Sequence, residues 1–140
     1  MKAIEHVDVY FDDLDLMGIM HNARYAVLIE RAITAYWIRR GFPFDSSRGL
    51  LAVAEFTITY RVPVTRLGPL GVEFWVDRLG RSSCVYGYRV VSPDETVHAY
   101  GTRVMINLDP LTRRPAPWPD ETREVAEGLL LPVEEPAHQG

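Results

Sequence analysis

Apolar and polar residues alternate at the start of the chain, with the period of an extended strand. The apolar positions on one side are Val7, Val9 and Phe11, and the polar side chains between them are Asp8 and Tyr10. A strand that buries only one face gives this alternation. The pattern predicts a half-buried strand over residues 4–11, followed by an acidic loop that runs to Gly18.

The apolar period changes to steps of three and four between Asn22 and Arg40. Seven large or small apolar side chains share one face at this spacing: Tyr25, Leu28, Ile29, Ala32, Ile33, Tyr36 and Trp37. A stripe of this kind is typical of an amphipathic helix. Asn22 is suited to cap the start of the helix, and Gly41, with Pro43 just beyond, is suited to end it.

Beyond a polar loop at residues 45–49, alternation returns in four successive segments. The segments cover residues 56–62, 72–76, 84–90 and 96–108. In the last one, Tyr100, Thr102, Val104, Ile106 and Leu108 share a face. Four consecutive strands with short connections predict an antiparallel meander. Asp120 is suited to cap a short helix that reaches about Leu130.

The order of elements is therefore a strand, a helix and four strands. One amphipathic helix against one antiparallel sheet is a two-layer α+β arrangement, and the wide apolar stripe requires the sheet to curve round the helix. We expect a single domain over residues 1–131. Residues 132–140 are expected to form a flexible C-terminal tail.

Composition excludes several classes of function. The chain has 140 residues and a formal net charge of −4, which argues against non-specific binding to nucleic acid. Cys84 is the only cysteine, so neither an intrachain disulfide nor a paired-cysteine metal site is expected. No apolar run approaches the length of a membrane span, and the N-terminus lacks the apolar core of a signal peptide. We therefore expect a cytoplasmic protein without a membrane partner.

The acidic loop carries the candidate chemistry. Asp12, Asp13 and Asp15 lie within four residues, just before Gly18 and the predicted helix. Amides at a helix N-terminus lack internal partners and carry partial positive charge, so they can polarise a thioester carbonyl. A nearby carboxylate can attack that carbonyl or activate a water molecule. This combination suits acyl transfer without a metal ion.

The same segment resembles the signature of the 4-hydroxybenzoyl-CoA thioesterase family of hotdog proteins, which includes the YbgC-like acyl-CoA thioesterases. That signature has an aromatic residue, the motif D-x-D-x-x-G, an apolar pair and a helical tyrosine. The matching positions are Phe11, Asp13, Asp15, Gly18, Ile19, Asn22 and Tyr25. The resemblance covers roughly residues 5–125. It implies the hotdog fold, in which a five-stranded antiparallel sheet wraps around one long central helix.

The resemblance also implies a function and roles for individual residues. The family hydrolyses acyl-CoA to a free acid and CoA without a cofactor or metal, as a homodimer or homotetramer with its site at the subunit interface. Asp15 matches the nucleophile or general base, and the backbone amide of Asn22 matches the group that polarises the carbonyl. Substrate or CoA contacts are implied at Gly18, Tyr25, Arg81, Ser82 and Ser83.

Some positions depart from the family pattern or leave alternatives open. A histidine that some members carry at the position of Asn22 stands one place earlier here, so His21 is a further candidate. Leu16 and Met17 are bulkier than the family's usual small residues. A thioesterase acting on acyl-carrier protein and a non-catalytic acyl-CoA-binding module remain alternatives, and a hotdog hydratase is disfavoured because its motif is missing. Glu30 and Glu55 are secondary carboxylate candidates.

Overall fold

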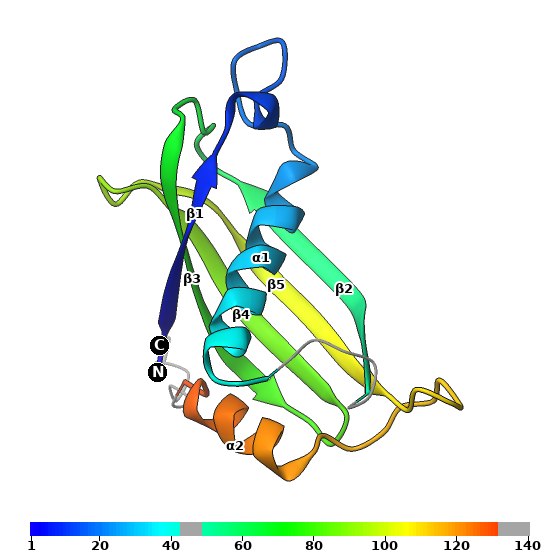
Figure 1. The fold of residues 1–140 in the computed structure, drawn as a ribbon. Coiled ribbons are helices and arrows are strands. Elements are labelled where there is room, and N and C mark those ends of the chain that lie inside the picture. Colours follow the sequence, from blue (N-terminus) through cyan, green and yellow to red (C-terminus); the bar gives the residue numbers. More distant parts are fainter. Residues whose placement is uncertain (43–48, 132–140) are drawn as a thin grey trace, which may run out of the picture.

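Five strands of this computed structural model, which describes residues 1–42 and 49–131, form one antiparallel sheet (Figure 1). The strands are β1 (Ala3–Val9), β2 (Leu50–Tyr60), β3 (Gly68–Leu79), β4 (Ser83–Val91) and β5 (Val97–Leu108). The helices are α1 (Arg24–Arg39), α2 (Asp120–Gly128) and the 3-10 turn η1 (Phe11–Asp13). The predicted α+β class and five-stranded antiparallel sheet are confirmed. Most of the predicted polar loop (residues 45–48), Pro43 and the predicted tail lie outside the described residues.

The strand order is β1-β3-β4-β5-β2, which corrects the predicted meander. Strands β3, β4 and β5 do pair in chain order, but β2 pairs with β5, from Leu50 opposite Leu108 to Tyr60 opposite Ala99. β1 occupies the place beside β3 instead. In Figure 1, α1 crosses the face of the sheet between β1 and β2. The chain that leaves α1 therefore reaches the sheet at the edge opposite β1.

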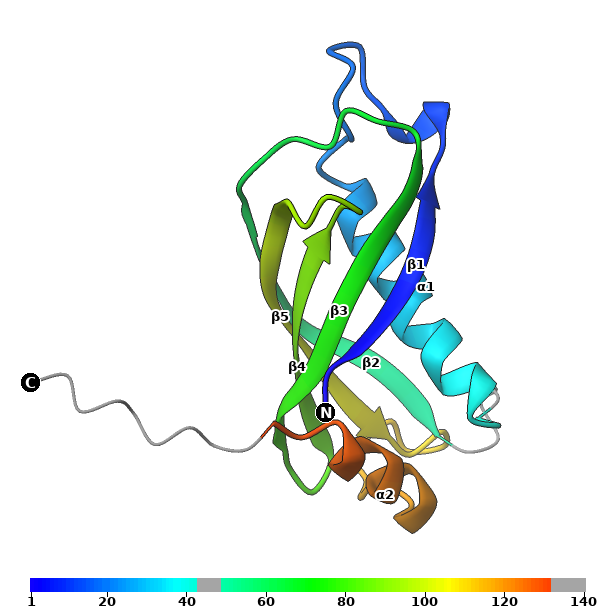
Figure 2. The same cartoon turned by 90° about the vertical axis from the view of Figure 1, so that its left-hand side faces the viewer.

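The helix α1 lies against one face of the sheet (Figures 1 and 2). All seven side chains predicted to share a helical face are buried. They pack on strand residues that are almost inaccessible, which are Val72, Phe74 and Val76 of β3 and Tyr86 and Tyr88 of β4. Tyr36 meets the Phe74 ring edge-on at 5.2 Å, and the Trp37 indole donates to the Tyr86 hydroxyl at 2.9 Å. Helix and sheet thus share one core.

The helix ends differ from the prediction at one end only. Asn22 is not the N-cap, because Ala23 occupies that position and α1 begins at Arg24. The His21 ring lies just outside the helix, where its Nδ1 accepts the Ala23 amide at 3.1 Å. At the other end, Gly41 has a φ of +84° and donates to the Ile38 carbonyl at 2.9 Å, which confirms it as the stop.

Two further boundaries are corrected. β1 ends at Val9, and Phe11 is 79% exposed in η1 rather than on the buried face of a strand. The cause is a turn in which the Tyr10 amide donates to the Asp13 carboxylate at 2.8 Å and the Asp13 amide donates to the Tyr10 carbonyl at 2.9 Å. At α2, Pro119 is the N-cap residue and Asp120 is the first helical residue.

On β5, the five residues predicted to share a face do so, but the opposite face is the buried one. That face carries Ala99, Arg103 and Asn107, each 8% exposed or less. The buried face of β5 therefore contains a charged residue, Arg103. No helix of the described residues is long and apolar enough to cross a membrane.

Candidate active site

Asp15 lies at the base of a tight loop that joins η1 to α1. Leu14 and Met20 pair across the loop, and the Asp15 amide donates to the Ile19 carbonyl at 2.8 Å. Gly18 closes the turn with a φ of +75°, which is a conformation that favours glycine. The tip of the loop, Leu16 and Met17, is fully solvent-exposed.

The carboxylate of Asp15 is held by one of its two oxygens. Oδ1 accepts the Met17 amide at 2.8 Å and the Ile19 amide at 3.4 Å. Within residues 1–42 and 49–131, Oδ2 has no protein partner. One oxygen is therefore oriented by the loop while the other stays available for chemistry.

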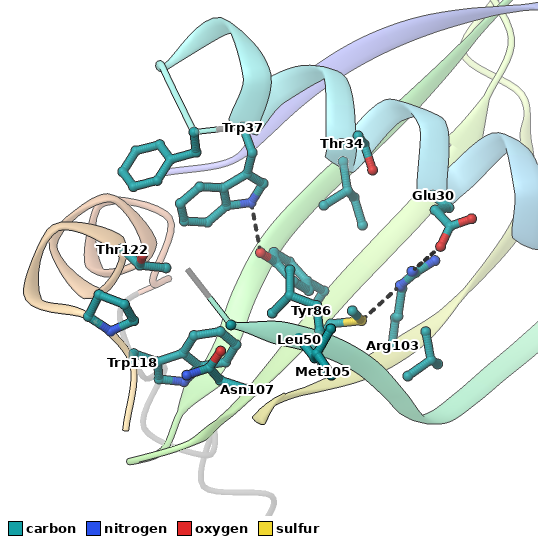
Figure 3. Close-up of a pocket in the computed structure, with 16 residues that line it drawn as sticks. Glu30, Thr34, Trp37, Leu50, Tyr86, Arg103, Met105, Asn107, Trp118 and Thr122 are labelled. Carbon is teal, nitrogen blue, oxygen red and sulfur yellow. Dashed lines mark hydrogen bonds and ion pairs between the residues drawn. The ribbon is translucent and has the colours of Figure 1, made fainter. Parts of the chain in front are cut away.

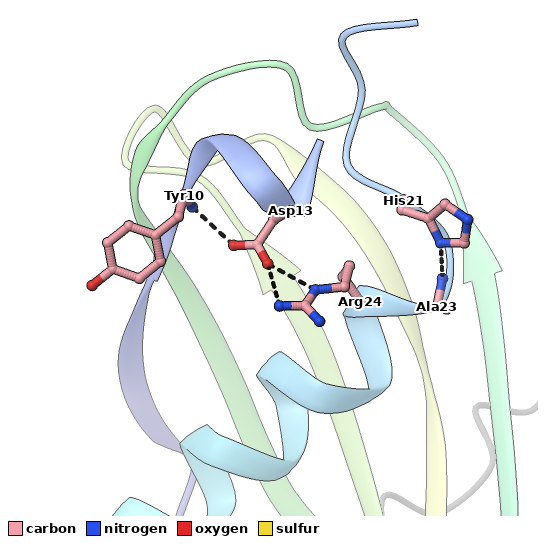
Figure 4. Close-up of polar contacts among 5 residues, drawn as sticks. All are labelled: Tyr10, Asp13, His21, Ala23 and Arg24. Atoms are coloured by element: carbon pink, nitrogen blue, oxygen red, sulfur yellow. Dashed lines mark hydrogen bonds and ion pairs between the residues drawn. The ribbon is translucent and has the colours of Figure 1, made fainter. Parts of the chain in front are cut away.

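Asp13 is a structural anchor of the loop, as Figure 4 shows. It is 1% exposed, its Oδ2 accepts the Tyr10 amide at 2.8 Å, and its Oδ1 accepts Nε and Nη2 of Arg24, both at 2.8 Å. Burial opposes ionisation, but the Tyr10 amide and the Arg24 guanidinium outweigh it and lower the pKa of Asp13. This anchor ties the loop to the first turn of α1.

The backbone amides that lead into α1 are nearly all in use. The Met20 amide donates to Val64, the His21 amide to Asp13, the Ala23 amide to the His21 ring and the Arg24 amide to His21. The Asn22 amide alone in this run has no acceptor among the described residues. It is a free donor at the start of a helix, where the helix dipole adds positive potential.

Asp15 and Asn22 line one cavity of about 300 Å³, which we call the loop cavity. His21, Tyr25 and Tyr60 also line it. Tyr25 meets the Tyr60 ring edge-on at 5.0 Å, and the Tyr60 hydroxyl donates to the Asn22 carbonyl at 3.0 Å. Tyr60 thus fixes the peptide next to the free Asn22 amide. The structure brings together the predicted residues Asp15, His21, Asn22 and Tyr25.

A second cavity of about 360 Å³ lies further along α1, between the helix, β2, β5 and the segment that leads into α2 (Figure 3). We call it the groove cavity. Its lining is mainly aromatic and aliphatic, including Ile33, Trp37, Leu51, Met105 and Trp118. Its polar lining residues include Arg103, which pairs with Glu30 at 3.0 Å. Neither Asp15 nor Asn22 lines this cavity.

The predicted CoA-contact residues Arg81, Ser82 and Ser83 are far from Asp15 within one chain. They lie where the chain passes from β3 into β4. The Asp15 loop instead follows the end of β1, where Val9 pairs with Gly68 at the other end of β3. The twelve residues of β3 separate the two ends by roughly 35 Å at the usual rise of a strand. This segment instead lies beside the groove cavity, since the Trp118 amide donates to the Arg81 carbonyl at 3.0 Å.

Two residues of these cavities were not singled out by the sequence as site residues. From the sequence, Tyr60 is expected to be an aromatic packing residue on a strand. Only the fold places it over the start of α1. Arg103 carries a detectable signal, because a charged residue falls between Ala99 and Met105 at even spacing on a predicted strand. Among the described residues, no group of three or more His, Cys, Asp or Glu side chains is placed to hold a metal ion.

Comparisons with known proteins identify the family of the chain. Residues 9–126 match the model of the thioesterase-like superfamily. The acyl-CoA thioester hydrolase YbgC of Escherichia coli O6:H1 is 26% identical over 116 residues, which are 81% of this chain and 87% of that protein.

Solved structures share the fold at lower identity. The DHNA-CoA thioesterase of Staphylococcus aureus superposes with a TM-score of 0.81 at 20% identity, over 91% of this chain and 92% of that one. The protein SAV2348 of the same species, solved in complex with CoA, gives a TM-score of 0.82 at 15% identity, over 98% and 90%. The family model spans the Asp15 loop, α1 and the strands β2 to β5, and so the chain belongs to the thioesterase-like superfamily.

Proposed function

We propose that this chain is a thioester hydrolase that converts an acyl-CoA into a free acid and CoA, with Asp15 as the catalytic carboxylate. The observation that carries the proposal is the free Asn22 amide in the same cavity as Asp15. A free amide at a helix start is an oxyanion donor, and a half-anchored carboxylate beside it is a nucleophile or base.

Both routes open to Asp15 use the same groups. As a general base, Asp15 takes a proton from water, the oxygen bonds to the thioester carbon, and the C–S bond breaks as the thiolate leaves and is protonated. As a nucleophile, Asp15 bonds to that carbon and expels the thiolate, and water then cleaves the resulting anhydride. In each route the Asn22 amide donates to the carbonyl oxygen as it gains charge. His21 accepts the Ala23 amide through Nδ1, which supports a positioning role for it in this scheme.

We further propose a homodimer, alone or paired into a tetramer, that completes the site. β2 is an edge strand with one unpaired side, and Leu51 and Val53 on it are about half exposed. A two-fold dimer pairs identical edges, and antiparallel pairing of two β2 strands puts Tyr60 of one copy beside Leu50 of the other. Tyr60 lines the loop cavity and Leu50 the groove cavity.

This arrangement would bring the loop cavity of one copy to the groove cavity of its partner. The acyl group would then lie in the groove cavity while Asp15 of the other copy acts on the thioester. Arg81, Ser82 and Ser83 would reach the CoA part of the substrate in the same way. A cytoplasmic location and a single domain over residues 1–131 stay predictions.

The first experiment separates an enzyme from a binding module. Thiol release is measured on short, long and aromatic acyl-CoAs and on the same acyl groups carried by acyl-carrier protein. Turnover of the CoA esters supports the proposal. Turnover of the carrier-protein esters alone would show that the substrate is an acyl-carrier-protein thioester and not an acyl-CoA. Binding of acyl-CoA without any thiol release would refute hydrolysis and leave a binding module.

A mixing experiment tests the shared site. Asp15→Asn removes the carboxylate, and Thr34→Trp fills the groove cavity that Thr34 lines. A co-expressed pair of these variants, isolated through two different tags, has one intact site only if carboxylate and groove come from different copies. We expect the isolated mixed dimers to have about half of wild-type activity, since each contains one intact site out of two. Mixed dimers without activity would refute the shared site but not hydrolysis by a single chain.

A further inference from the structure

Arg103 is a buried arginine on the floor of the groove cavity. It comes from β5, its side chain is 7% exposed, and it faces α1 across the cavity (Figure 3). An arginine is seldom buried unless its charge and its donors are satisfied. The partners of its guanidinium group therefore show what this part of the cavity is suited to bind.

The protein satisfies only part of this guanidinium. Nη2 donates to Oε1 of Glu30 at 3.0 Å, and Nε points to the thioether of Met105 at 3.2 Å, which is a weak acceptor. In the part of the chain that the structure describes, Nη1 has no protein acceptor, yet no fully buried side-chain nitrogen or oxygen lacks a partner. Nη1 is therefore reached from the cavity.

Two neighbouring polar side chains are already engaged in hydrogen bonds within the protein. The Tyr86 hydroxyl accepts the Trp37 indole, and the Asn107 amide donates to the carbonyls of Ala116 and Pro117 at 3.1 and 3.0 Å. The side chain of Glu30 is 57% exposed. Arg103 thus offers free donors inside a cavity whose remaining walls are mainly aromatic and aliphatic.

We propose that Arg103 is a specificity-determining residue that binds an oxygen atom on the acyl group of the substrate. This inference rests on the proposed function and narrows it to acyl groups with a hydrogen-bond acceptor remote from the thioester. A hydroxyl group would accept from Arg103 and donate to Glu30. A carboxylate would pair with Arg103 and would require Glu30 to turn toward solvent, which its exposure permits.

The test compares acyl-CoAs of one chain length that end in a methyl, a hydroxyl or a carboxylate group. The specificity constants for thiol release are measured for wild type, Arg103→Met and Arg103→Lys. The matched control is Arg89→Met, because Arg89 also forms an arginine–glutamate pair, with Glu73, but on adjacent strands away from the cavity. Binding of the same esters to Asp15→Asn and Asp15→Asn/Arg103→Met, measured by calorimetry, gives a readout that does not need turnover.

Wild type is expected to favour one oxygenated ester over the methyl ester by roughly ten- to a hundredfold, the range of a hydrogen bond to a charged group. Arg103→Met should abolish this preference, Arg103→Lys should keep part of it, and Arg89→Met should leave it unchanged. Glu30→Gln distinguishes the two kinds of acyl oxygen. It should raise the specificity constant for the carboxylate ester and lower it for the hydroxyl ester.

Equal or better use of the methyl ester by wild type, with the same ratio in Arg103→Met, would overturn the inference. Arg103 would then be an ion-pair anchor between β5 and α1, and hydrolysis itself would stand. If no ester is hydrolysed, the proposed function fails, and the calorimetric preference still decides the role of Arg103.

Discussion

Replacing Asp13 with asparagine probes the anchor that holds the catalytic loop against α1. The substitution keeps the shape of the side chain but removes its charge. Three contacts at 2.8 Å, from the Tyr10 amide and from Nε and Nη2 of Arg24, then meet a neutral group with a single acceptor oxygen. The freed Arg24 guanidinium, 36% exposed, regains water. Losing the hydrogen bonds to the buried charge destabilises the fold, and the return of water to Arg24 offsets part of this loss. We expect the free energy of unfolding to fall by about 2–3 kcal/mol.

The assay is urea unfolding of wild type, Asp13→Asn and the control Asp12→Asn, whose side chain is exposed in the same turn. The pKa of Asp13 is lower in the folded chain than in the unfolded one. Its contribution is therefore fully present above the ordinary carboxyl pKa and is lost as the pH falls through the lowered folded value. The gap between wild type and Asp13→Asn should be widest at neutral pH and should close in acid.

The activity should follow the anchor, because the loop that carries Asp15 is joined to α1 through Asp13. We expect thiol release by Asp13→Asn to fall well below that of Asp12→Asn even where both are folded. A stability gap that stays the same from neutral pH to strong acid would refute the ionised anchor. Equal stability of Asp13→Asn and wild type would refute it as well.

Three further predictions concern other parts of the molecule. Gly101→Ala should lower the free energy of unfolding by about 1–3 kcal/mol, because its new methyl group would lie 2.0 Å from the Thr57 carbonyl oxygen. Urea unfolding measures the loss, and Gly128→Ala is the control because Gly128 has open space around it. Burial raises the pKa of the Cys84 thiol to about 12, so thiol reagents at pH 8 should label the native chain far more slowly than the unfolded chain, and rapid native labelling would contradict the buried site. Arg81→Ala should raise KM for acyl-CoA and leave kcat unchanged, with no effect on acyl-pantetheine, and an equal effect on both substrates would show that Arg81 does not contact the nucleotide part of CoA.

Local periodicity was sufficient to predict the elements but not their arrangement. The helical stripe from Tyr25 to Trp37 is buried as its spacing indicates, since helix burial follows the period of the sequence. The place of β2 beyond β5 depends on where α1 delivers the chain, and no local pattern encodes that. Phe11 shows the same limit, because a turn set by Asp13 overrides the alternation of β1.

The candidate site divides in a similar way. The motif places Asp15 and Asn22 close together in sequence, so their shared cavity was predictable. The contact of Tyr60 with the Asn22 carbonyl was not predictable from the motif, because it joins residues 38 positions apart and is a tertiary effect. The distance between Asp15 and Arg81 also emerged only from the sheet, and it is the reason the proposed site needs a second copy.

The central claim is that Asp15 is the carboxylate that drives thioester hydrolysis. The most direct measurement is kcat for thiol release by Asp15→Asn, with the folded state checked by circular dichroism and with Asp12→Asn as the control from the same loop. We expect Asp15→Asn to keep the fold and bind acyl-CoA while kcat falls by roughly 10²–10⁴-fold, the usual contribution of a positioned acid–base group. A folded Asp15→Asn chain that releases thiol at the wild-type rate would contradict the account.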